Sequence, residues 1–122
     1  MAGLTNGEAQ ATLDARFPTS GGTDYIAYSV NGTSEFASLA RTSVGATGWA
    51  AATAADPSVK ANSAVLTSAA ASGAGTVTHF AIYTAVTAGT QRTDWQALSA
   101  SKVLAIGDKV EWAAGACVVT LT

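Results

Sequence analysis

The chain has 122 residues, a length that fits one ordinary domain, and a formal net charge of −2. Charged residues make up only 11%, whereas hydrophobic residues make up 48%, and Ala, Thr, Ser and Gly together account for 68 residues. This composition excludes general disorder, and the scattered basic residues exclude a patch that could neutralise a run of nucleic-acid phosphates.

The first predicted element is a helix over about residues 6–17. Thr5 or Asn6 can cap its start, and no glycine or proline interrupts it after the first turn. Leu13 and Phe17 lie four residues apart and therefore share one face. A helix this short is marginal alone, so we expect it to pack on the rest of the chain.

Short strands and turns follow the helix. Aromatic and β-branched runs bounded by turn residues predict strands at 25–30, 39–44, 59–68, 76–84 and 93–99, then a hairpin of 109–112 and 117–121. Alternation places in the core Ile26, Tyr28, Val30, Phe80, Ile82, Val110, Trp112, Cys117, Val119 and Leu121. The predicted fold is mainly β: a single domain over 1–122, with an antiparallel β-sandwich or small barrel over about 23–122 and one N-terminal α-helix.

Side chains suited to catalysis or metal binding are scarce. His79 is the only histidine and falls on the side of its strand opposite Phe80 and Ile82. Cys117 is the only cysteine and lies in an apolar run, which is typical of a buried small hydrophobe. The acidic residues are isolated, and no nucleophile elbow or phosphate loop occurs. We therefore expect no enzyme activity, and no catalytic, cofactor-binding or metal-binding residues.

The three tryptophans differ in their surroundings. Trp112 alternates with Val110 and is predicted to be core. Trp49 lies in a glycine- and alanine-rich loop, where a large aromatic side chain either folds back onto the domain or anchors a partner, and we favour folding back. Trp95 is either core or exposed at a sheet edge. Trp49 and Trp95 are thus the two candidate partner-interface residues.

Membrane association is not expected from the sequence. No run approaches 18 apolar residues, and no basic amphipathic helix occurs. The N-terminal residues also lack a basic start followed by an apolar stretch, so we expect no secretory signal.

Two segments carry a family resemblance. Residues 76–83 (TVTHFAIY) and 107–121 (GDKVEWAAGACVVTL) resemble a pattern, VTHFGIY followed by GD-V-F-AAGALTVTL, of small tailed-bacteriophage virion proteins. The helix and the run from Tyr25 to Tyr28 match as well, so the resemblance covers nearly the whole chain. It departs from the family over residues 34–41, where the family tends to place an aromatic residue just before the arginine and this chain has Leu39 and Ala40 before Arg41.

The resemblance implies a non-enzymatic structural protein of the virion, assembled in the host cytoplasm. Such proteins are labelled tail-fibre, minor tail or head decoration proteins. Because 122 residues do not supply the shaft and attachment regions of a complete fibre, we expect a capsid decoration protein. Its partners would be the major capsid protein and further copies of itself, a trimer being one arrangement.

Two other functions remain open. The first is a minor tail or tail-fibre-associated protein whose loops touch the host surface, with Trp49 and Trp95 available to stack on sugars. The second is a carbohydrate-binding accessory of an enzyme, against which the absence of an aromatic row counts.

Overall fold

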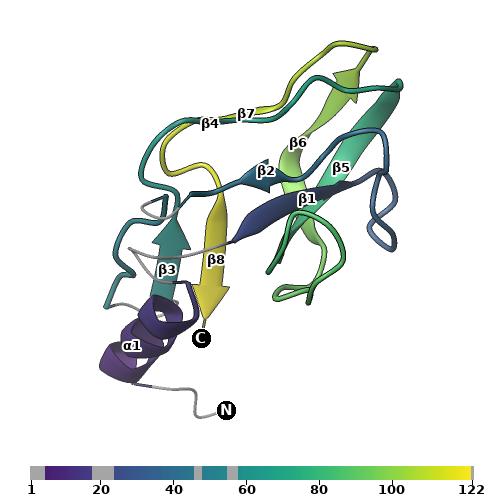
Figure 1. Ribbon diagram of the computed structural model, residues 1–122. Coiled ribbons are helices and arrows are strands. Elements are labelled where there is room, and N and C mark those ends of the chain that lie inside the picture. Colours follow the sequence, from purple (N-terminus) through teal and green to yellow (C-terminus); the bar gives the residue numbers. More distant parts are fainter. Residues whose placement is uncertain (1–4, 18–23, 46–47, 55–57, 122) are drawn as a thin grey trace. The chain divides into compact units, whose positions relative to one another are not determined.

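The computed structural model describes residues 5–17, 24–45, 48–54 and 58–121, and Figure 1 shows their arrangement. These residues form one helix and eight strands: α1 (Asn6–Arg16), β1 (Tyr25–Ser29), β2 (Thr42–Ser43), β3 (Ser58–Ala61), β4 (Leu66–Thr67), β5 (Gly75–Tyr83), β6 (Gln96–Leu104), β7 (Glu111–Trp112) and β8 (Val118–Leu121). The strand pairs with a described register are antiparallel. The predicted class, mainly β with one N-terminal helix, is confirmed; the sandwich or barrel arrangement stays a prediction.

The chain divides into two compact units. Unit 1 comprises Met1–Gly22, Val44–Val65 and Trp112–Thr122, and unit 2 comprises Thr23–Ser43 and Leu66–Glu111. Each unit is therefore built from segments that lie far apart in the sequence. The expectation of a single domain over 1–122 stays a prediction.

In unit 1, α1 begins and ends close to the predicted residues. Thr5 caps the helix, since its hydroxyl accepts a hydrogen bond from the Glu8 backbone N–H at 3.3 Å. The Phe17 backbone N–H closes the last turn on the Leu13 carbonyl at 2.8 Å. Ala9 and Leu13 are the buried residues of α1, which packs against β3. Tertiary packing therefore stabilises this short helix, as expected.

The strand next to this helix buries a charge. Lys60 lies in β3, which pairs with β8, and it is 0% exposed. Its ammonium group lies 2.6 Å from the Asp14 carboxylate of α1, which also accepts a hydrogen bond from the Ala52 backbone N–H at 2.9 Å. A buried cation needs such a partner, because desolvation of an unpaired charge is very costly. The pair therefore links the helix to the strand and to the segment around Ala52.

The predicted C-terminal hairpin is wrong. A tight turn does form, with the Ala116 backbone N–H donating to the Ala113 carbonyl and Gly115 at a φ of +82°. The flanking strands nevertheless pair elsewhere: β7 with β4, and β8 with β3. Asn62 explains part of this outcome, since its side chain donates to the Ala113 carbonyl and accepts from the Cys117 backbone N–H. The turn is thus held to the end of β3 instead of being closed by its own two strands.

Unit 2 contains a four-stranded sheet in the order β2-β1-β5-β6. Its central strand β1 aligns with β5 over its whole length, from Tyr25 opposite Tyr83 to Ser29 opposite His79. Four consecutive β1 residues, from Ile26 to Ser29, are buried, so both faces of this strand are covered. The alternating pattern correctly placed the larger side chains of β1 in the core, but Val30 lies beyond the strand and is exposed.

Three predicted strands change their limits. The run 59–68 is two strands, β3 and β4, because Asn62 turns its side chain onto neighbouring backbone groups between them. The run 93–99 becomes β6, which starts at Gln96 and continues to Leu104. The run 39–44 shortens to the two residues of β2. Small residues carry little periodicity, so these boundaries depend on tertiary pairing.

Candidate functional site

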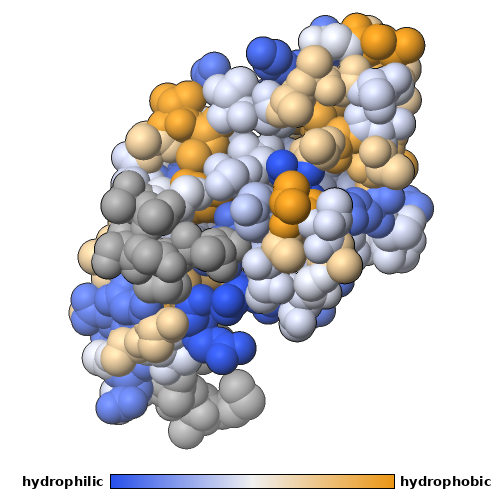
Figure 2. Space-filling model, viewed as in Figure 1, coloured by the Kyte–Doolittle hydropathy of each residue, from blue (hydrophilic) through white to orange (hydrophobic). Residues whose placement is uncertain are grey.

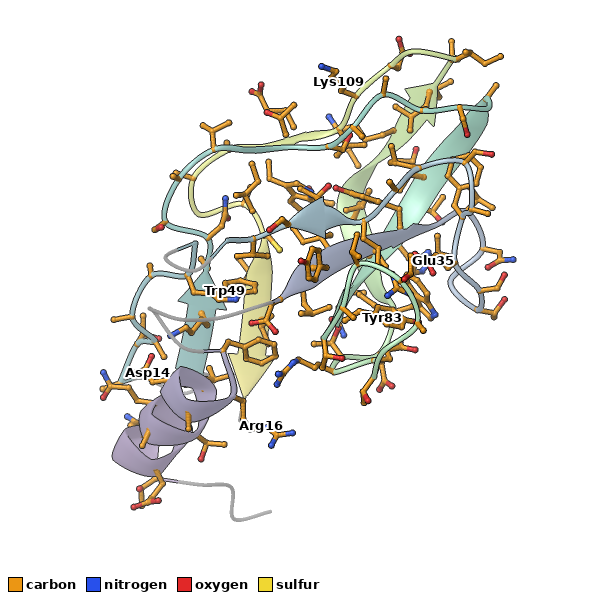
Figure 3. All side chains as sticks on the ribbon, in the orientation of Figure 1. Asp14, Arg16, Glu35, Trp49, Tyr83 and Lys109 are labelled. Carbon is orange, nitrogen blue, oxygen red and sulfur yellow. The ribbon has the colours of Figure 1, made fainter. Side chains whose placement is uncertain are left out.

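Arg41 is the centre of a polar and aromatic cluster in unit 2. Its guanidinium group makes a two-pronged ion pair with Glu35, with N–O distances of 2.8 and 2.9 Å, and lies 3.9 Å from the centre of the Tyr83 ring. The Arg41 side chain is only 6% exposed, and its hydrogen bonds to Glu35 raise its pKa above the ordinary value. Figure 3 shows Glu35 and Tyr83 close together beside β1. A planar guanidinium group that pairs with a carboxylate and stacks on an aromatic ring is typical of arginine in partly buried sites.

The same guanidinium holds the loop that follows β5. Its Nη1 atom donates hydrogen bonds to the carbonyl oxygens of Ala85 and Ala88, at 2.8 and 2.7 Å. The loop is closed at its base, where the Thr84 backbone N–H donates to the Thr90 carbonyl. Ala88 adopts a φ of +52°, a conformation that non-glycine residues rarely adopt without support from their surroundings. Arg41 therefore fixes the conformation of loop 84–91.

Two aromatic rings flank this loop. Tyr83 ends β5 and Trp95 precedes β6, and their ring centres lie 6.2 Å apart at an angle of 51°. Both residues are partly exposed. The Tyr83 hydroxyl donates to the Gln91 side chain at 3.2 Å, and the Gln91 amide donates to the Thr93 carbonyl. We call Glu35, Arg41, Tyr83, Gln91, Trp95 and loop 84–91 the Arg41 cluster.

A buried ion pair supports the strand segment next to this cluster. Asp24 is almost fully buried, and its carboxylate lies 3.0 Å from the Arg92 Nε atom. The Arg92 backbone N–H donates to the Ile82 carbonyl at 2.7 Å, and the Thr93 hydroxyl accepts from the Ile82 backbone N–H. These contacts attach Arg92 and Thr93, which follow loop 84–91, to Ile82 of β5. Both ends of the loop are therefore held in place.

The two predicted interface residues have different surroundings. Trp49 is 2% exposed and contacts Phe17 edge-to-face, with ring centres 5.6 Å apart. It folds back into the core of unit 1, the alternative that the sequence favoured, and a side chain so buried offers no surface to a partner. Trp95 remains partly exposed on unit 2. Of the two candidates, only Trp95 lies where a partner could reach it.

His79 and Cys117 occupy structural positions. The His79 ring packs closely on Gly32, in the turn after β1. A Cβ atom added to Gly32 would lie only 2.9 Å from the His79 Nε2 atom. Its Nδ1 atom lies 2.8 Å from the Thr78 hydroxyl. Cys117 is fully buried, and desolvation raises the pKa of its thiol to about 12. A thiol with such a pKa is almost entirely protonated at neutral pH and is a poor nucleophile.

Metal ligands do not gather within the described ranges. No group of three or more His, Cys, Asp or Glu residues is placed there so that it could hold a metal ion. In the same part of the chain, no helix has the length and apolar character needed to cross a membrane.

The sequence did not reveal the Arg41 cluster. In the sequence, Arg41 is one of the scattered basic residues in a segment that departs from the family pattern, and Glu35 is one of the isolated acidic residues. The hydrogen bond from Arg41 to the Ala88 carbonyl joins residues 47 positions apart, which no local spacing connects. The sequence predicts Tyr83 near the end of its strand and Trp95 in the middle of the strand 93–99, whereas in the structure Trp95 precedes β6, so no pattern in the sequence joins these two rings to Arg41.

The comparisons with known proteins point to one family. The model of a family described as "Podophage GP4 fiber I protein gp80" matches residues 5–120. The match covers α1 and every strand except the last residue of β8. No curated protein matches the chain significantly.

Proposed function

The chain belongs to the podophage GP4 fiber I protein gp80 family of tailed-phage virion proteins, and we propose that it is a fibre-associated component that contacts the host surface. Its role as a structural protein of the phage virion follows from the family. The proposal goes further on two points: the fibre as its position, and the Arg41 cluster as its contact surface.

The name of the family supports the fibre over the capsid. The expectation of capsid decoration rests on the chain length and on the low charge and small-residue composition, neither of which identifies a position in the virion. A short chain fits a fibre equally well when it supplies only one module of the whole fibre. We therefore adopt the tail-fibre alternative in place of capsid decoration.

The geometry of the Arg41 cluster supports its use as a contact surface. Arg41 and the Asp24–Arg92 pair hold loop 84–91 in one conformation, so little conformational entropy is lost when a partner binds there. The loop between the partly exposed residues Tyr83 and Trp95 presents Val86, which is exposed. Aromatic side chains with a polar handle are favoured in recognition surfaces.

The proposed activity is binding without chemistry. The polar groups of the cluster are engaged in ion pairing or hydrogen bonding to the protein itself, and the only thiol and the only imidazole lie elsewhere. A catalytic group would need a tuned pKa and access to a substrate. We propose that the chain acts through its surface and turns over no substrate.

The position in the virion is tested by cryo-electron microscopy of intact phage particles. The chain, with the sheet order β2-β1-β5-β6 as its fingerprint, is expected in density attached to the fibres or tail. Density for the chain only on the capsid shell would contradict the proposal and favour the capsid decoration hypothesis instead. A tagged copy located with gold-labelled antibody gives the same answer at lower resolution.

A further inference from the structure

Trp95 is a partly exposed aromatic side chain that rests on a fixed neighbour. Its ring centre lies 6.2 Å from that of Tyr83. The Tyr83 ring is itself fixed, since the Arg41 guanidinium lies 3.9 Å from its centre and its hydroxyl donates to Gln91 at 3.2 Å. Trp95 thus has a rigid support and keeps part of its surface in solvent. Such a ring loses little conformational entropy when a flat ligand stacks on it.

A carboxylate without a partner comes next to this ring in the chain. Asp94 directly precedes Trp95, so their Cα atoms are about 3.8 Å apart. Asp94 is exposed, and its carboxylate makes no hydrogen bond or ion pair with any of the residues that the structure describes. A carboxylate accepts several hydrogen bonds and donates none. The group it suits is therefore a hydroxyl donor on a ligand that stacks on Trp95.

The charges around the ring favour an uncharged ligand. Arg41 and Arg92 are each paired with a carboxylate, so neither cation is available to an anion. Lys102 lies in β6 about 20 Å from the start of that strand. A phosphate, sulfate or carboxylate group placed at Trp95 would therefore meet the negative charge of Asp94 while both nearby arginines are already paired.

The apolar surface at this position is small. In Figure 2, apolar and polar atoms alternate over the loop between β5 and β6, whereas a broader apolar area lies where Figure 1 places the tip of β6. An aromatic side chain buries about 150–250 Å² in all, so a partly exposed one offers on the order of 100 Å². A standard protein–protein interface takes roughly 800 Å² from each partner. The exposed part of Trp95 therefore matches one ring of a small ligand.

We propose that Trp95 and Asp94 bind an uncharged sugar ring, an inference that rests on the host-contact role proposed above and names its ligand class. A pyranose presents a face of C–H groups, which the electron-rich face of an indole attracts, and a rim of hydroxyl groups. The C–H face stacks on Trp95. A rim hydroxyl donates to the Asp94 carboxylate, and a hydrogen bond to a charged acceptor is stronger than one between neutral groups.

Nucleic acids and peptides fit these two residues less well. A nucleobase also stacks on aromatic rings, but its attached phosphates would meet the charge of Asp94 without an available arginine. A peptide that binds through its backbone would find the Ala85 and Ala88 carbonyls already bound to Arg41. One sugar ring binds weakly, so copies of the chain held together in a virion would act through avidity.

Matched pairs of neutral and acidic sugars test the ligand class. The purified chain, displayed on beads, is applied to arrayed oligosaccharides of glucose, galactose and mannose, and to the same oligosaccharides oxidised at C6 to uronic acids. We expect binding to at least one neutral member and at least fivefold weaker binding to its acidic counterpart. Trp95→Ala should lower binding to the neutral member at least tenfold. Asp94→Asn should lower it at least threefold and reduce the preference for the neutral member to less than twofold.

Two variants elsewhere in unit 2 are the matched controls. Glu111→Gln removes a carboxylate from another exposed residue, and Val103→Ala shortens another exposed apolar side chain. Both should bind the neutral member as the natural chain does, and all four variants should keep the natural circular dichroism spectrum. No binding to any neutral member, a preference for an acidic member, or unchanged binding by Trp95→Ala would overturn the inference.

Host binding is scored separately, so that this inference and the host-contact role can fail independently. The same beads are incubated with host bacteria, with and without the bound neutral oligosaccharide as a competitor. We expect the competitor to lower host binding at least fivefold. Host binding that the competitor does not reduce would contradict the sugar as the ligand and favour a protein receptor. Sugar binding by a chain that binds no host cells would support the sugar site and contradict the host-contact role.

Discussion

The Arg41 guanidinium lies 3.9 Å from the centre of the Tyr83 ring, and the same group binds two carbonyl oxygens of the loop that Tyr83 leads into. One side chain thereby connects three segments of unit 2: the chain around Glu35, the end of β5 and loop 84–91. The conformation of the proposed contact surface therefore depends on one side chain, which is itself only 6% exposed.

Replacing Arg41 should destabilise the folded chain. Lysine keeps the charge but lacks the planar fork, so it cannot serve Glu35 and the two carbonyls together. We expect Arg41→Lys to lower the free energy of unfolding by about 1 kcal/mol and Arg41→Ala by about 2 kcal/mol, because the Glu35 carboxylate and the two loop carbonyls lose donors while remaining partly open to water. Urea denaturation followed by circular dichroism measures both. The exposed Lys109→Ala variant is the control and should change stability by less than about 0.5 kcal/mol. An Arg41→Lys variant as stable as the natural chain would show that the several donors of the guanidinium group are not needed here.

Acid should weaken the link between α1 and β3. The hydrogen bond from Lys60 lowers the pKa of the Asp14 carboxyl below its ordinary value of 3.8. Since this pKa is lower in the folded than in the unfolded chain, the pair contributes stability above about pH 4. That contribution is lost as the pH falls through the folded-state pKa.

The Asp14→Asn variant isolates this effect. Asp14 is 38% exposed, so at pH 7 we expect a loss of only about 1–2 kcal/mol. Between pH 5 and pH 2 the variant should lose less stability than the natural chain, as measured by urea midpoints at each pH. The Asp94→Asn variant changes an exposed residue and is the control. Its stability should depend on pH as that of the natural chain does. Identical acid sensitivity of the natural chain and Asp14→Asn would count against this role of the pair.

Asn62 should be the most sensitive polar residue of unit 1. Its buried amide donates to the Ala64 and Ala113 carbonyls at 2.8 and 2.9 Å and accepts from the Cys117 backbone N–H at 2.9 Å. We expect Asn62→Ala to cost about 3 kcal/mol, because the buried Cys117 N–H and two carbonyls in part-buried hydrogen bonds lose a partner. Asn62→Asp should cost at least as much, since its carboxylate would face two carbonyl oxygens. Thermal unfolding measures both, with the exposed Asn6→Ala as control; a change of less than about 1 kcal/mol in Asn62→Ala would contradict the expectation.

Elements with strong local signals were predictable from the sequence. The cap at Thr5 and the spacing of Leu13 and Phe17 defined α1 almost to the residue. The aromatic and β-branched residues of β1 and β5 located both central strands. In these segments local propensity and tertiary environment favour the same structure.

The pairings were not predictable, for a physical reason. The chain around Gly115 forms the tight turn that the sequence indicates, yet its strands pair with β3 and β4 because Asn62 binds the turn. Arg41 likewise gains its partners only when β5 and the segment around Glu35 come together. Contacts of this kind depend on tertiary structure and leave no periodic trace in the sequence.

The central claim is that the surface of the Arg41 cluster binds the host, and cell binding tests it most directly. The purified chain, displayed on beads so that weak contacts add, is incubated with host bacteria and bound beads are counted. We predict that Trp95→Ala lowers binding at least tenfold while its circular dichroism spectrum stays native, and that Val65→Ala, exposed on unit 1, binds like the natural chain. Unchanged binding by Trp95→Ala, or no binding by the natural chain, would contradict the account.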